Sequence, residues 1–168
     1  MSDKIVNRVA NSELKTIDLE DYYPKGERTV LDIKSWLFHE IIIKEADFRE
    51  HLKNHDWSQY QNKYVALTCS ADAIIPSWAF MLITTYISPF AKKIVVGDIT
   101  NLESSIFQDI INELPIDQFL AKPIIIKGCA QKPIPDTAYT QLIEKLQPVV
   151  KSIMFGEACS TVPLFKKK

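Results

Sequence analysis

The chain contains an internal repeat, and each copy of the repeat carries a cysteine shortly after an apolar run. Residues 59–98 align with residues 118–157 at a constant offset of 59 residues. The matched pairs include Gln59 with Gln118, Lys63 with Lys122, Pro76 with Pro135, Ala79 with Ala138, Pro89 with Pro148 and Gly97 with Gly156. A repeat of this length encodes one supersecondary unit, so the fold is predicted to contain the same unit twice.

Each copy has the pattern strand, helix, strand. Apolar runs that do not alternate with polar residues predict four strands, at residues 64–67, 94–96, 123–126 and 153–155. Helical patterns between and after them predict helices over about 76–88, 101–114 and 136–146. Strands that are apolar throughout are typical of a parallel sheet covered on both faces. We therefore predict an α/β fold with three layers and one mostly parallel sheet, built from a duplicated βαβ unit.

The first 56 residues precede the repeat and are predicted to extend it. Residues 28–33 alternate like a strand, and residues 36–43 contain a second strand-like run. Together they predict an N-terminal β-hairpin or an edge addition to the sheet, and we adopt the hairpin. Residues 45–54 follow with Phe48 and Leu52 at the spacing of one helix face, which predicts a short helix.

Length and composition restrict the class of protein. A chain of 168 residues suits a single domain, 1–168, with an N-terminal extension and two repeats; their ranges are 1–56, 57–98 and 116–157. The formal net charge is −1, which does not favour a nucleic-acid-binding protein. The N-terminus does not resemble a signal peptide, and the longest apolar run is interrupted by Pro76, so no membrane span is predicted. We expect a cytoplasmic protein without a disulfide framework, because its three cysteines are an odd number.

The three cysteines all follow predicted strands. Ligands of open α/β sheets bind beyond the carboxyl ends of the strands. Those ends carry Cys69, Asp98, Cys129, Glu157 and Cys159. Three thiolates suit zinc or an iron–sulfur cluster, and either carboxylate is a candidate for a fourth ligand. The sequence therefore predicts a metal site at one edge of the sheet.

Two other interpretations of the cysteines remain open. Free cysteines are commonly buried as small apolar residues. A cysteine before a helix can instead be a reactive thiol, because the helix N-terminus lowers the thiol pKa, and Cys69 and Cys129 have this position. A thiol enzyme would then need His51 or His55 from elsewhere in the fold as its base.

Small polar residues at the same strand ends are candidates for binding an anionic cofactor. Ser70, Gly128, Ser160 and Thr161 offer backbone N–H and hydroxyl groups there. The sequence has neither the GxGxxG nor the GxxxxGK[ST] pattern, so we predict no nucleotide.

A different class of function is a metal-free binding or scaffolding module. In that case the cysteines belong to the core, and an exposed apolar patch around Trp36 and Phe38 binds a partner. No catalytic residue is identified, a non-enzymatic role is favoured, and homo-oligomer formation is left open.

Several longer motifs resemble a bacterial family known as domain of unknown function 2480. They are NHDWSQYQNKYVALTCSADAIIPSWAFMLI, KSIMFGEACSTVP, IVNRVANS and YYPKGER. The resemblance covers nearly the whole chain and includes the three cysteine positions. The family is associated with neighbouring genes for iron–sulfur assembly of the sulfur-mobilisation type. The resemblance thus implies a metal or iron–sulfur accessory role, with iron–sulfur assembly proteins as partners.

Overall fold

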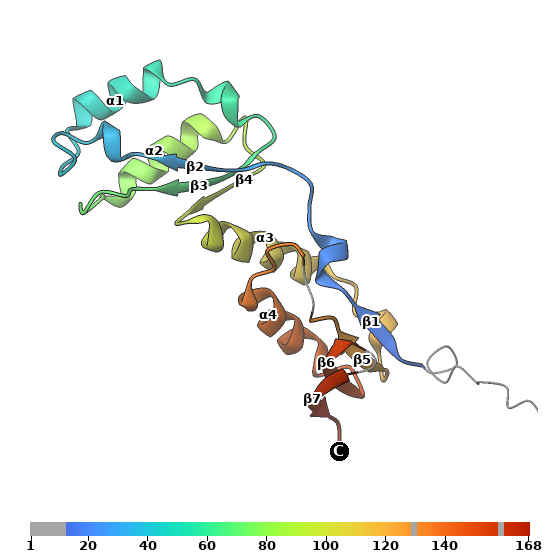
Figure 1. Ribbon diagram of the computed structural model, residues 1–168. Coiled ribbons are helices and arrows are strands. Elements are labelled where there is room, and N and C mark those ends of the chain that lie inside the picture. The colour runs from blue at the N-terminus through green and yellow to red at the C-terminus, as the bar shows by residue number, and fades with distance from the viewer. Residues whose placement is uncertain (1–12, 129–130, 158–159) are drawn as a thin grey trace, which may run out of the picture. The chain divides into compact units, whose positions relative to one another are not determined.

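The computed structural model describes residues 13–128, 131–157 and 160–168 (Figure 1). The chain divides into two compact units. One is Pro24–Ile106, which we call the central unit, and the other is formed by the chain up to Tyr23 and from Phe107 onwards, which we call the flanking unit. Each unit has its own sheet and its own buried core. The α/β class and the largely parallel strand arrangement are as predicted.

The central unit contains three parallel strands in the order β2-β3-β4. These are β2 (Arg28–Asp32), β3 (Tyr64–Thr68) and β4 (Lys93–Val96). The connection from β2 to β3 contains α1 (Glu45–Asn54), and the connection from β3 to β4 is α2 (Ser77–Ile87). Neighbouring parallel strands need such crossover connections, because the chain must return to the other end of the sheet before the next strand begins.

Both crossover helices pack on the same side of this sheet. Phe48 and Leu52 of α1 are fully buried, as expected for residues one helical turn apart. They belong to one core with Val65 and Leu67 of β3 and with three residues of α2, which are Ala79, Ile83 and Ile87.

The flanking unit has a four-stranded sheet in the order β1-β5-β6-β7. Its strands are β1 (Lys15–Ile17), β5 (Pro123–Ile126), β6 (Ser152–Glu157) and β7 (Ser160–Lys166); β7 is antiparallel and the others are parallel. The β5–β6 crossover is α4 (Asp136–Leu146). The remaining helices in the described ranges of the two units are α3 (Ile99–Glu113) and four short 3-10 helices: Leu19–Tyr22, Lys34–Trp36, Trp57–Tyr60 and Asp117–Phe119.

The duplicated βαβ unit is present, with one copy in each sheet. The segment β3-α2-β4 corresponds to β5-α4-β6, and both α2 and α4 follow a proline at the same aligned position. Backbone geometry repeats as well. Asn62 and Ala121 have φ of 61° and 55°, and Gly97 and Gly156 have φ of 139° and 126°. Only glycine readily adopts the last two values, so this aligned position requires glycine in both copies, directly after β4 in the first and near the end of β6 in the second.

Two details of the predicted fold are wrong. The copies do not share one sheet, because β3 pairs with β2 and β5 pairs with β1, so each copy has a different first neighbour. The predicted N-terminal hairpin is also absent from this segment. Strand β2 is parallel to β3, and residues 36–43 contribute only an isolated bridge between Phe38 and Ile42.

The apolar residues after β2 explain why no hairpin forms. Ile33 and Leu37 are buried by the tight turn of the 3-10 helix, whereas Ile41 and Ile42 are exposed. The run of isoleucines has the composition of a strand, but only Ile43 packs against the core. Separately, no helix in the described part of the chain is long and apolar enough to cross a membrane.

Candidate functional site

Of the predicted metal ligands, those that the structure describes follow strands of two different sheets. Cys69 follows β3 in the central unit, where it is partly exposed, packs beside the core and forms no disulfide. Cys129 and Cys159 lie outside the described residues. In the ranges that the structure describes, no three His, Cys, Asp or Glu side chains are grouped as for a metal ion. The premise of a single sheet edge is therefore wrong, and the metal site itself stays a prediction.

The two candidate carboxylates have structural roles of their own. Asp98 comes after β4 and caps α3: its Oδ1 accepts from the N–H of Asn101 at 2.8 Å, and Asn101 Oδ1 accepts from the N–H of Asp98 at 3.0 Å. Glu157 is the last residue of β6 in the other sheet, where it is paired with Ser160 of β7.

The predicted anion-binding residues lie in different surroundings. The N–H of Ser70 donates to Asp32 Oδ1 at 3.0 Å, so this donor is already hydrogen-bonded to a carboxylate of the protein. Burial alone would raise the pKa of Asp32, but hydrogen bonds from Ser70 and Lys34 hold it below its usual value. Ser160 and Thr161 belong to β7, and the Thr161 hydroxyl contacts the Met154 sulfur at 3.7 Å.

Gly128 lines a hollow of about 540 Å³ at the carboxyl end of β5. A Cβ atom at this position would lie 2.8 Å from the Phe155 ring, so glycine is required for the ring to pack there. The other lining residues are Lys132, Pro133, Ile134, Asp136, Tyr139, Thr140 and Phe155. Burial raises the pKa of Tyr139, and nearby carboxylates add to this effect, so its hydroxyl keeps its proton at neutral pH.

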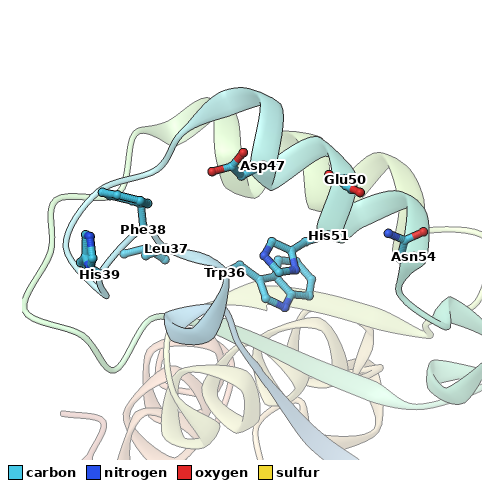
Figure 2. Close-up of a pocket in the computed structure, with 8 residues that line it drawn as sticks. All are labelled: Trp36, Leu37, Phe38, His39, Asp47, Glu50, His51 and Asn54. Atoms are coloured by element: carbon cyan, nitrogen blue, oxygen red, sulfur yellow. The ribbon is translucent and has the colours of Figure 1, made fainter.

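Another pocket lies in the central unit, between α1 and the segment after β2 (Figure 2). It has a volume of about 460 Å³. Its lining residues are Trp36, Leu37, Phe38, His39, Asp47, Glu50, His51 and Asn54. All eight come from two short stretches of sequence, so the pocket is built locally on the rigid βαβ scaffold.

Trp36 and His51 form the floor of this pocket. Figure 2 shows the two rings side by side, and they are nearly parallel, with 4° between their planes and 6.0 Å between their centroids. Trp36 is held from behind by edge contacts with Phe48 and Trp57, at centroid distances of 5.8 and 6.3 Å. Trp36 is 9% exposed, so its ring is a fixed surface rather than a mobile side chain.

His55 supports Trp36 from the side. Its ring meets the Trp36 ring edge-on at 5.2 Å, and its Nε2 lies 2.9 Å from the Tyr60 hydroxyl. Burial lowers the pKa of His55, and the carboxylate of Asp56 opposes this only in part. His55 is therefore neutral at pH 7 and adds no positive charge near the pocket.

The loop side of the pocket is conformationally unusual. His39 and Glu40 have φ of 51° and 57°, which is uncommon for residues other than glycine. Such backbone conformations cost free energy, and strained residues of this kind tend to cluster at functional sites. The same loop exposes Phe38, Ile41 and Ile42, with 40%, 62% and 52% of their surfaces accessible. We call residues 36–42 the aromatic loop.

The helix side of the pocket is acidic. Asp47 and Glu50 lie on α1 above the Trp36 ring (Figure 2), and no lysine or arginine is among the lining residues that the structure describes. Carboxylates beside an aromatic face attract a cationic group, because both the charges and the ring favour it. The sequence alone suggested Trp36 and Phe38 as a binding patch, but it did not suggest the acidic face of α1. That face could have been found from the spacing of its residues, which lie three or four positions apart: Asp47, Glu50, His51 and Asn54.

The fold and its pockets define a two-unit α/β protein with a duplicated βαβ element and an acidic, aromatic pocket in its central unit. Residues 3–167 match the family model described as "Protein of unknown function (DUF2480)", and the chain belongs to this family. No protein with a curated description and no solved structure matches it significantly.

Proposed function

We propose that this protein is a protein-binding accessory module whose partner docks on the aromatic loop and α1. The observation that carries the proposal is the position of three exposed apolar side chains beside an acidic pocket with an aromatic floor. Solvent-exposed apolar groups in a cluster with a polar rim are typical of interaction sites. The proposal corresponds to the metal-free binding module considered from the sequence.

The chemistry of the pocket indicates the kind of partner. An arginine or lysine side chain would enter the pocket beside the stacked rings of Trp36 and His51 and pair with Asp47 and Glu50. Apolar neighbours of that residue would contact Phe38 and Ile41 on the loop. The partner segment is therefore basic and apolar in alternation. The Lys44 Nζ lies 3.0 Å from the Phe38 ring centroid, so one contact between a cation and an aromatic ring is already present at this loop.

Peptide selection against the immobilised full chain tests this proposal. We expect the enriched peptides to carry arginine or lysine next to apolar residues. The combined change Asp47→Asn and Glu50→Gln should weaken their binding about tenfold or more, equivalent to about 1.4 kcal/mol, because it removes both negative charges. Ile41→Ser should weaken binding through lost apolar contact.

The matched control changes the same number of charges elsewhere. Asp72 and Glu144 are exposed and outside the pocket, so Asp72→Asn with Glu144→Gln should leave the dissociation constant unchanged. Selected peptides without basic residues, or equal binding by both double variants, would contradict the proposed docking site.

A second candidate function is metal or iron–sulfur binding through the cysteines, in line with an accessory role beside iron–sulfur assembly proteins. It is supported by the pairing of β5 with β6, in which Ile126 is opposite Phe155. Neighbouring parallel strands end at the same sheet edge. Cys129 and Cys159 follow these two residues by three and four positions in the sequence. Zinc or an iron–sulfur cluster would use such thiolates.

Elemental analysis of protein purified without air tests the second candidate. We expect stoichiometric iron or zinc in the wild type and its loss in Cys129→Ser and in Cys159→Ser, because each change removes a thiolate ligand. Cys69→Ser, assayed in parallel, shows whether the third cysteine takes part. A wild-type protein free of metal would refute this candidate and leave the peptide-binding proposal unaffected.

A further inference from the structure

The strand β4 forms an open edge of the sheet in the central unit. The described strands of that sheet have the order β2-β3-β4, so β4 is paired on one side only. In the flanking unit the equivalent strand is β6, and its outer edge is covered by the antiparallel strand β7. The repeat thus provides an internal comparison: the same edge is covered in one copy and open in the other.

Backbone groups of β4 point towards this open edge. The N–H of Gly97 donates to the carbonyl of Leu67 on β3 at 2.9 Å. Because successive residues of a strand direct their backbone groups to alternate sides, the N–H and C=O of Val96 and Ile94 point away from β3. Edge groups of this kind pair readily with a further strand.

The outer face of α2 beside this edge is apolar. Its sequence from Ser77 to Ile87 contains no charged residue, whereas the equivalent helix α4 carries Asp136, Glu144 and Lys145. Met81 and Val96 are 68% and 56% exposed. They line a shallow hollow of about 480 Å³ with Ser77, Phe80 and Thr84. An exposed patch with apolar residues of this size and no charge is typical of an interaction surface.

The β4 segment is complementary to itself in charge. Read from Lys92 to Asp98, it begins with two lysines and ends with an aspartate. In an antiparallel pair centred on Val95, the lysine-bearing start of β4 in one copy lies at the same end of the pair as Asp98 of the other. Asp98 itself follows Gly97 and caps α3, so it lies outside the paired strands. Ile94 lies opposite Val96, and these are the residues whose backbone groups face the open edge. The hydrogen-bonding pattern therefore sets the register, and the charges favour the antiparallel orientation.

We propose that β4 pairs with β4 of a second copy of this chain, in antiparallel orientation about a two-fold axis. The two sheets become one continuous sheet, and the α2 helices of the two copies cover each other's apolar faces. Such an interface uses the same patch on both copies, as a two-fold dimer requires. This interface is separate from the aromatic loop, and the inference does not rest on the proposed function.

The oligomeric state of the full chain tests the interface. Size-exclusion chromatography with light scattering should give twice the monomer mass of 19.2 kDa. Met81→Asp places a charge on the apolar face and should give a monomer of unchanged stability, because this side chain is exposed. Leu120→Asp changes an equally exposed residue, 63% accessible, in the flanking unit and should remain dimeric. A monomeric wild type, or a dimer unaffected by Met81→Asp, would overturn the proposal.

Cysteine cross-linking tests the register. In the proposed pairing the two Val95 residues face each other directly, with Cα atoms about 4.5 Å apart, a separation that a disulfide can bridge. Val95→Cys should give a covalent dimer on mild oxidation, with the linked peptide containing residue 95 by mass spectrometry. Val96→Cys should not link to itself, because its partner is residue 94. Linkage through 96 in place of 95 would refute the antiparallel register, and the wild type controls for the native cysteines.

Discussion

Replacing Glu103 by alanine should lower the free energy of unfolding by about 3–5 kcal/mol, because it leaves a buried arginine without its carboxylate. Glu103 Oε1 accepts from Arg28 Nε at 2.7 Å, and the side chains are 6% and 12% exposed. The Arg28 Nη1 also donates to the carbonyls of Pro24 and Gly26, at 2.8 and 2.7 Å. These carbonyls satisfy its hydrogen bonds but cannot neutralise its charge.

Urea denaturation followed by tryptophan fluorescence measures this effect directly. All three tryptophans lie in the central unit together with Arg28 and Glu103, so the signal reports on the unit that the substitution affects. Glu103→Gln should cost less, because the amide oxygen still accepts a hydrogen bond. Changing Arg28 to Met together with Glu103 to Leu should recover much of the loss, because no unpaired charge remains.

An exposed ion pair in the same unit supplies the control. Arg49 Nε and Glu45 Oε1 are 2.9 Å apart on α1, but their side chains are 51% and 64% exposed. Arg49→Ala should therefore cost only about 0.3–0.5 kcal/mol. If Glu103→Ala and Arg49→Ala lowered the free energy of unfolding by similar amounts, burial would not explain the contribution of the Arg28–Glu103 pair to stability.

The sequence predicted the local elements well, because periodic patterns report on which residues a single element buries. The helices at 45–54 and 136–146 have the predicted bounds. Residues such as Phe48 and Leu52 are one turn apart and both face the core, so their spacing carries the information. The duplicated βαβ unit was predictable for the same reason, since its glycine and proline positions are fixed by local backbone geometry.

Pairing between distant elements was not predictable in this way. A continuously apolar run indicates a buried strand but does not indicate which strand pairs with it. The same sequence pattern is therefore compatible with one sheet or with two. Arg28 and Glu103 are 75 positions apart, and neither residue type alone indicates a buried pair. The hairpin prediction failed because the isoleucines at 41 and 42 have strand composition but serve as an exposed loop.

The candidate pocket shows the same limit. His39 and Glu40 adopt left-handed backbone conformations, which are uncommon outside glycine and which the local sequence does not predict at two successive positions. The aromatic loop therefore takes a course that depends on how Ile33 and Leu37 are buried by the rest of the unit. Trp36 was noted in the sequence as an interaction candidate, but its role as a fixed floor under two carboxylates appears only in three dimensions.

Phe48→Ala should also lower the free energy of unfolding by about 3–5 kcal/mol, the usual cost of removing a buried phenylalanine ring. The Phe48 side chain is fully buried and meets Trp36 and Trp78 edge-on, each at a centroid distance of 5.8 Å. The substitution removes ring contacts on both tryptophans and leaves a cavity under the floor of the pocket. Urea denaturation followed by tryptophan fluorescence measures the loss.

Comparison with Ile41→Ala separates folding from binding. Ile41 lies in the same unit but is 62% exposed, so truncating it should change the free energy of unfolding by less than about 0.5 kcal/mol. The same change should weaken peptide binding, because Ile41 is at the proposed interface. Phe48→Ala is expected to weaken binding as well, but through loss of the support that holds Trp36. If Phe48→Ala left both stability and binding unchanged, the rigid aromatic floor would not be the basis of the site.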